Sequence, residues 1–203
     1  MERTTAKIIS YLFHPLLMPT YVMAILLNIH AYFALVIPQE AKWRIIFLVF
    51  AITFVFPVLI TYLMIRIRLI RSFEMHSREE RVLPLITTVV FFYLAYYLIK
   101  EVNISPLYSY FAIGATFVAV ITLILNFFWK ISIHMMGMGA VFGTLLGLSL
   151  TFYISIPNLI FLSLLIAGLT GFARLKLQAH KPPEIYIGFL SSAVIMLLLF
   201  LFI

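Results

Sequence analysis

The sequence predicts an all-α protein that crosses a membrane several times. Of its 203 residues, 65% are hydrophobic and only 10% are charged, whereas soluble domains carry about 25% charged residues. The apolar residues gather in runs of about 20, the length that an α-helix needs to cross a bilayer. We therefore expect a polytopic transmembrane helix bundle, with residues 1–203 forming a single transmembrane domain.

Hydropathy predicts six or seven spans, and we count seven. The expected spans are residues 8–37, 44–69, 83–100, 107–129, 132–153, 156–172 and 184–203. The first is long and contains Pro15 and Pro19, so a short interfacial helix is expected at its start. A tight turn is expected near Pro157. No cleavable signal peptide is expected, because the first apolar run is too long and no small-residue cleavage site follows it.

Composition excludes several kinds of chemistry. The chain has no cysteine, which excludes disulfides, thiolate metal sites and cysteine nucleophiles. All seven acidic residues are glutamates, and only Glu74, Glu79 and Glu80 cluster, among arginines. Because a two-metal site needs several neighbouring carboxylates, we expect no metal and no other cofactor.

The net charge of +7 admits two interpretations. Basic residues on a polytopic protein commonly mark the cytoplasmic side of the membrane. Alternatively, they form a binding site for a phosphorylated substrate. We do not expect nucleic acid to be a partner.

The charged residues gather in three clusters, at 66–84, 129–134 and 172–184. Two predicted spans separate each cluster from the next, and an even number of crossings returns the chain to the same side. The three clusters are therefore expected to share one membrane face, where they could form one site. That face carries the larger share of lysine and arginine, so the positive-inside rule predicts that it is cytoplasmic.

The three clusters contain residues suited to phosphate chemistry. Guanidinium groups bind phosphate oxygens through paired hydrogen bonds and keep their charge. An imidazole can attack phosphorus or donate a proton to a leaving oxygen. Together they supply what phosphoryl transfer without a metal requires. The candidates are Arg71, Arg78, Arg81, Arg174, His134 and His180.

Two of the clusters carry motifs that resemble signatures of the type 2 phosphatidic acid phosphatase superfamily. The pattern A-R-x5-H-x3-E at 173–184 resembles the third signature, S-R-x5-H-x3-D. The sequence I-S-I-H at 131–134 resembles the second signature, P-S-G-H. The first signature, K-x6-R-P, is matched loosely: Arg71 and Arg78 keep its spacing, but Glu79 stands in place of proline. The resemblance covers about residues 66–200.

The resemblance implies a role for each matched residue. His180 would be the nucleophile and form a phosphohistidine, His134 would protonate the leaving group, and Glu184 would orient His180. The phosphate would be held by Arg174 together with Arg71, Arg78 or Arg81, and by Lys130 and Ser132.

The function implied by the resemblance is metal-independent hydrolysis of a lipid phosphate monoester or diphosphate. Phosphatidate, phosphatidylglycerol phosphate and undecaprenyl diphosphate are the candidate substrates, and a bacterial inner membrane is the implied location. The resemblance favours a site on the outer face, opposite to the one that the positive-inside rule predicts, so the face stays open. Three departures, Ile133 for glycine, Ala173 for serine and Glu184 for aspartate, leave an alternative open. In that alternative the protein is a catalytically silent relative that binds an anionic lipid or a membrane-protein partner.

The remaining polar and small residues have structural interpretations. His14 and His30 are expected to be packing or interfacial residues, and His76 a solvated interfacial residue near the arginines. Glycines recur every fourth residue at 139, 143 and 147, a pattern that lets helices approach closely in lipid. We expect these glycines to serve packing within the bundle, so that no oligomer is required.

Overall fold

The structure is a computed structural model that describes residues 2–75 and 77–202, so His76 lies outside the described residues. All regular secondary structure in the described residues is helical, which confirms the all-α prediction. Seven helical segments within these residues are long and apolar enough to cross a membrane, and the protein is an integral, multi-pass membrane protein. The seven segments are Arg3–Asn28, Gln39–Arg66, Arg78–Glu101, Pro106–Phe128, Ile133–Phe152, Pro157–Lys176 and Pro182–Leu201.

The chain divides into two compact units. The first unit combines Met1–Met18 with Lys130–Ile203, and the second is Pro19–Trp129. The expectation that residues 1–203 form one domain stays a prediction.

The predicted first span, 8–37, was wrong in its extent. The chain forms α1 (Arg3–Leu12), a 3₁₀ turn η1 (Pro15–Leu17), α2 (Met18–Asn28) and a short α3 (Tyr32–Leu35). Pro15 has no backbone N–H to continue α1, and His14 in front of it is extended, as residues before proline prefer. The expected short helix at the start is therefore present as α1, and the span ends at Asn28.

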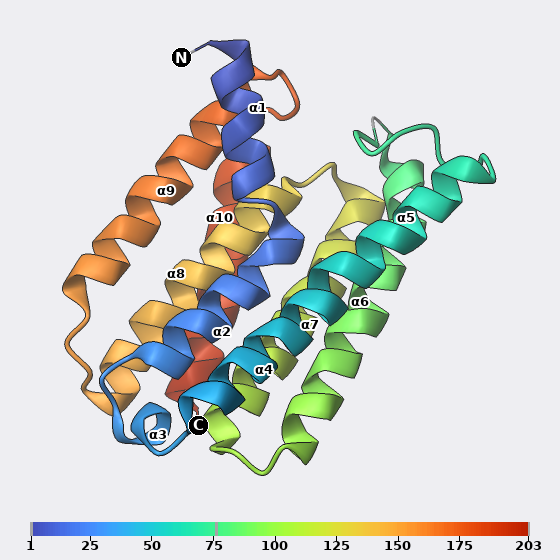
Figure 1. The fold of residues 1–203 in the computed structure, drawn as a ribbon. Coiled ribbons are helices and arrows are strands. Elements are labelled where there is room, and N and C mark those ends of the chain that lie inside the picture. Colours follow the sequence, from blue (N-terminus) through green and yellow to red (C-terminus); the bar gives the residue numbers. More distant parts are fainter. Residues whose placement is uncertain (1, 76, 203) are drawn as a thin grey trace. The chain divides into compact units, whose positions relative to one another are not determined.

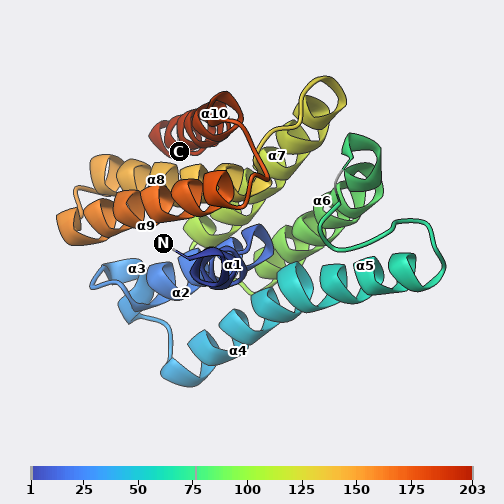
Figure 2. The same cartoon turned by 90° about the horizontal axis from the view of Figure 1, so that it is seen from above.

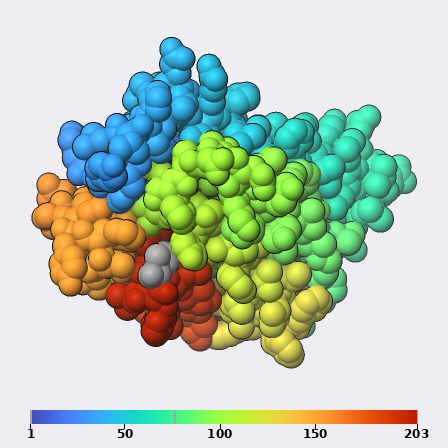
Figure 3. Space-filling model, turned by 90° about the horizontal axis from the view of Figure 1, so that it is seen from below, coloured from blue at the N-terminus to red at the C-terminus, as the bar shows by residue number. Residues whose placement is uncertain are grey.

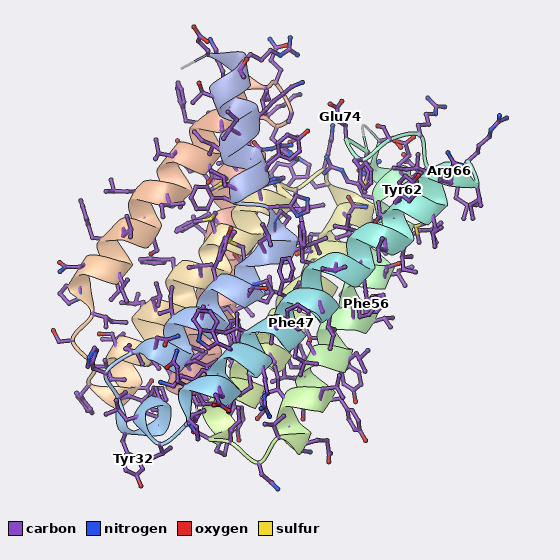
Figure 4. The ribbon with its side chains drawn as sticks, viewed as in Figure 1. Tyr32, Phe47, Phe56, Tyr62, Arg66 and Glu74 are labelled. Atoms are coloured by element: carbon purple, nitrogen blue, oxygen red, sulfur yellow. The ribbon has the colours of Figure 1, made fainter. Side chains whose placement is uncertain are left out.

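The second unit contains the other helices between residues 19 and 129. They are α4 (Gln39–Phe50), the π-helical turn η2 (Ala51–Val55), α5 (Phe56–Arg66), α6 (Arg78–Glu101) and α7 (Pro106–Phe128). The π turn ends two residues before Pro57, which cannot donate an intrahelical hydrogen bond. Large aromatic side chains are exposed along α4 and α5, among them Phe47, Phe56 and Tyr62 (Figure 4). Such a surface is expected of helices that face lipid.

In the first unit, α8 (Ile133–Phe152) packs against both α10 (Pro182–Leu201) and α9 (Pro157–Lys176) (Figures 1 and 2). The N-terminal α1 packs against α9. The predicted turn near Pro157 is confirmed, because α8 ends at Phe152 and Pro157 begins α9. The Thr151 hydroxyl donates to the Phe200 carbonyl at 2.9 Å. That bond ties the end of α8 to the end of α10. The C-terminal part of α10 is visible in red in Figure 3.

The glycines at 139, 143 and 147 are where α8 meets α10. A Cβ atom on Gly139 would collide with the Phe189 carbonyl, and one on Gly143 with the Ala193 carbonyl. Only glycine lets the two backbones approach this closely. The glycine pattern therefore serves packing within the bundle, as predicted.

We expect Gly143→Leu to destabilise the protein strongly, because the new side chain would push against the α10 backbone. Overpacking typically costs about 1–3 kcal/mol, and a helix backbone cannot move aside as a side chain can. Thermal unfolding in detergent would measure the effect. The matched control is Gly168→Leu on α9, where an added Cβ meets no atom within 4 Å. Equal melting temperatures for the two variants would contradict the assigned packing.

Candidate active site

The connector between α9 and α10 places His180 and Glu184 one helical turn apart. Helix α9 ends at Lys176, and Gln178 then takes a left-handed conformation with φ 55°. The next helix begins at Pro182, a favoured residue for a first helical position. Glu184 follows in the first turn of α10, where a negative charge is favourable. The sequence thus puts a histidine just before a helix and a carboxylate just inside it.

The expected contact between His180 and Glu184 is present. His180 Nδ1 lies 2.8 Å from Glu184 Oε2, and both side chains are buried. A carboxylate oxygen can only accept, so the hydrogen bond places the proton on Nδ1 and, in the neutral ring, the lone pair on Nε2. The same carboxylate oxygen accepts the Lys181 backbone N–H at 3.2 Å. The His180 ring is therefore fixed in one tautomer and one orientation.

The start of α8 is held against the start of α10. The Ser132 N–H donates to the Glu184 carbonyl at 3.2 Å. A Cβ on Gly188 would lie only 3.1 Å from the Ser132 carbonyl oxygen, so glycine allows this approach. Ser132 occupies the N-cap position of α8, as expected, but its side chain makes no capping hydrogen bond. Its hydroxyl is buried and has no hydrogen-bond partner among the described residues.

His134, in the first turn of α8, contacts the N-terminal helix. Its Nε2 lies 3.1 Å from the Ser10 carbonyl oxygen. Because that oxygen only accepts, Nε2 carries the hydrogen. Arg174 on α9 donates from Nη1 to the Ser10 hydroxyl at 3.4 Å. One residue of α1 therefore contacts both His134 and Arg174.

His14 joins the same group of side chains. Its ring lies perpendicular to that of His134, with 5.5 Å between the ring centroids. Arg174 shares its partner Ser10 with His134, and His180 is linked to the start of α8 through Glu184, whose carbonyl accepts the Ser132 N–H. We call these residues, His14, His134, Arg174, His180 and Glu184, the histidine cluster. All five belong to the first unit.

The three candidate arginines of the second unit make contacts within that unit. Arg78 donates to the carbonyls of Phe127 and Phe128, at 3.3 and 2.9 Å, where α7 ends. Arg81 is buried and donates from Nε to the Met75 carbonyl at 3.2 Å. The exposed Arg71 lies 3.6 Å from Glu80.

Arg78 therefore has a structural role, because cations stabilise the carbonyl end of a helix, and Arg81 ties the loop at Met75 to α6. The roles of Arg71, Arg78 and Arg81 in binding phosphate stay predictions. The same holds for Lys130, which is half-buried two residues before Ser132.

Sequence reasoning missed Ser10 and His14 as members of this site. His14 was expected to be a packing or interfacial residue. A usable signal was present, because an ionisable residue within a predicted span is a functional candidate by default. Ser10 gave no such signal, since its contacts to His134 and Arg174 join residues far apart in sequence.

The fold and the histidine cluster define an integral membrane protein of the all-α class with a buried histidine–glutamate pair. No family model matches the chain, and neither a curated protein nor a solved structure matches it. Within residues 2–75 and 77–202, no three His, Cys, Asp or Glu side chains are grouped to hold a metal ion. The function is therefore inferred from the cluster's own chemistry and from the signature motifs.

Proposed function

We propose that the protein is a membrane phosphatase that hydrolyses a phosphate monoester or diphosphate on a lipid through a phosphohistidine intermediate. The observation that carries the proposal is the buried bond of 2.8 Å between His180 Nδ1 and Glu184 Oε2. A carboxylate that accepts from Nδ1–H directs the lone pair of the neutral ring to Nε2. It also stabilises the positive charge that the ring gains when Nε2 bonds to phosphorus.

The reaction would take two steps. In the first, His180 Nε2 attacks phosphorus, the P–N bond forms, the bond to the lipid oxygen breaks, and that oxygen takes a proton from His134, which starts the cycle as the imidazolium and ends the step as the neutral ring. In the second, water attacks phosphorus, the P–N bond breaks and inorganic phosphate leaves, while His134 takes the proton from the water. Protons and bonds balance over the cycle, and the nucleophile and the acid are restored.

The charges of the cluster suit an anionic substrate. Arg174 is a permanent cation that can hold two phosphate oxygens at once. Glu184, the one carboxylate of the cluster, is bonded to His180. The Arg174 guanidinium can therefore stabilise the negative charge of a bound phosphate and of the transition state.

The cluster's position favours a lipid substrate. His134, Arg174, His180 and Glu184 lie at or next to the ends of the segments Ile133–Phe152, Pro157–Lys176 and Pro182–Leu201, and His14 lies inside Arg3–Asn28. A phosphorylated headgroup can reach such a place while its hydrocarbon tail stays in the bilayer. Phosphatidate, phosphatidylglycerol phosphate and undecaprenyl diphosphate are the substrates we propose, in a bacterial inner membrane. One chain supplies the whole cluster, so the proposal requires no oligomer.

A second candidate function is binding without catalysis. One observation favours it: Glu184 Oε2 also accepts the Lys181 N–H, so the carboxylate has a structural role in starting α10. In addition, Ile133 and Ala173 stand where the signatures have glycine and serine. The protein would then hold an anionic lipid or a membrane-protein partner at the same cluster.

A panel assay separates the two functions. Purified protein in detergent would be incubated with phosphatidate, phosphatidylglycerol phosphate and undecaprenyl diphosphate, with and without a chelator, and released phosphate would be measured. Release from one or more lipids in the presence of chelator supports the phosphatase. No release from any lipid, with or without added divalent metal, makes binding without catalysis the better account.

A further inference from the structure

The N-terminal helix lies outside the region that resembles the phosphatase signatures, yet it supplies polar groups to the histidine cluster. Helix α1 packs against α9, which carries Arg174. Ser10 is buried, accepts from Arg174 through its hydroxyl, and meets His134 Nε2 with its carbonyl. The Ser10 hydroxyl also donates to the Ala6 carbonyl at 2.9 Å, which fixes its direction. The N-terminal helix therefore positions two groups of the cluster.

The turn after α1 fixes the tautomer of His14. His14 is the N-cap of η1, and its Nδ1 accepts the Leu16 backbone N–H at 3.3 Å. A ring nitrogen that accepts from an amide carries no hydrogen, so the hydrogen of the neutral ring is on Nε2. In that neutral tautomer the Nε2–H of His14 is a hydrogen-bond donor.

The surroundings of His14 attract an anion. Arg174 acts on it as a nearby positive charge, and the neighbouring ring is that of His134, whose Nε2 is also a donor. The carboxylate of the cluster, Glu184, is bonded to His180 and Lys181. Donors on α8 and α9 therefore lie near the Nε2–H of His14, and an oxyanion with several acceptor oxygens matches this set.

We propose that His14 binds a phosphate oxygen of the substrate through Nε2–H, and that Ser10 is a positioning residue for Arg174 and His134. The choice of phosphate as the ligand rests on the proposed function. His14 lies in the N-terminal segment, at a position that none of the signature motifs covers.

Two substitutions separate this role from a purely structural one. In His14→Asn, the side-chain oxygen can replace Nδ1 as acceptor for the Leu16 N–H, and asparagine is a good N-cap, but no donor reaches the position of Nε2. In His14→Gln, the longer side chain brings an amide N–H near the position of Nε2 and gives up the cap. A structural role predicts a normal Asn variant, whereas a phosphate ligand predicts that Gln binds better than Asn.

The experiment is a calorimetric titration of the full-length protein in detergent with inorganic phosphate. Wild type should bind, and His14→Asn should bind roughly 10- to 100-fold more weakly, the usual effect of losing a hydrogen bond to a charged group. Its melting temperature should stay close to that of wild type. His14→Gln should recover part of the lost affinity. Phosphate affinity in His14→Asn equal to that of wild type would overturn the inference, as would a wild type that binds no phosphate.

The lipid assay distinguishes failure of this inference from failure of the proposed function. A wild type that binds phosphate with the expected His14 dependence but hydrolyses no lipid phosphate leaves the His14 site standing and removes the phosphatase. The opposite outcome is a wild type that hydrolyses a lipid phosphate and a His14→Asn variant with the same KM and the same phosphate affinity. That result removes the His14 site and leaves the phosphatase standing.

Discussion

His180→Ala is expected to abolish release of phosphate from the lipid that the wild-type protein hydrolyses. The imidazole forms the P–N bond in the proposed mechanism, and alanine offers no atom that can replace it. Removal of a covalent nucleophile lowers turnover by several orders of magnitude in well-studied hydrolases. The measurement is inorganic phosphate released per protein over time. Quenched reactions with radiolabelled lipid phosphate should also show an acid-labile, base-stable protein label in wild type and none in the variant.

The matched control for this variant is His30→Ala. His30 is an exposed histidine in the second unit, outside the regular helices, and it contributes to no part of the cluster. Both variants should insert into membranes and be folded at the assay temperature, and His180→Ala should melt below wild type, because it leaves the buried Glu184 carboxylate without the His180 hydrogen bond. The mechanism is wrong if wild type hydrolyses a lipid phosphate and His180→Ala does so equally fast.

Most of the fold could be predicted from the sequence because the bilayer fixes helix length. An apolar run of about 20 residues has one stable arrangement in lipid, an α-helix that satisfies its own backbone hydrogen bonds. The prediction of 132–153 and the observed α8, Ile133–Phe152, differ by one residue at each end. Glycine spacing also predicted correctly which residues of α8 face a neighbouring helix.

The errors fall where hydropathy does not report helix ends. The second span was predicted to begin at 44, but α4 begins at Gln39, because polar residues such as Glu40 and Lys42 extend a helix beyond the apolar run. The first span was predicted to reach 37, although α2 ends at Asn28. The π turn at Ala51–Val55 leaves no mark on hydropathy, since its residues are as apolar as their neighbours.

The site was predictable only where its contacts are local. His180 and Glu184 are four residues apart in the sequence, and α10 begins between them. This local geometry brings the two side chains within hydrogen-bond distance. The Ser10–His134 contact joins residues 124 positions apart. Contacts of that kind depend on how α1 packs against the rest of the unit, and a pattern within one segment does not contain that information.

His134→Ala is expected to slow hydrolysis strongly for poor leaving groups and only weakly for good ones. A lipid alkoxide needs a proton as it leaves, whereas nitrophenolate is stable without one. General acid catalysis contributes typically 10²–10⁴-fold, so turnover of the lipid phosphate should fall by about that factor. Nitrophenyl phosphate hydrolysis by the same variant should fall much less. The measurement is kcat/KM for both substrates in wild type and variant.

The control for this contrast is His14→Asn. This variant is proposed to lose a hydrogen bond to phosphate but to keep the general acid, His134. Both substrates present the same phosphate to His14, so their kcat/KM values should fall by similar factors in that variant. His134 holds its Nε2 hydrogen against the Ser10 carbonyl, and the leaving oxygen would have to take that carbonyl's place as acceptor. If His134→Ala slows both substrates equally, His134 does not act as the acid. If instead His14→Asn slows the lipid phosphate much more than nitrophenyl phosphate, His14 is the general acid. This assignment is possible because the rings of His14 and His134 are neighbours in the cluster.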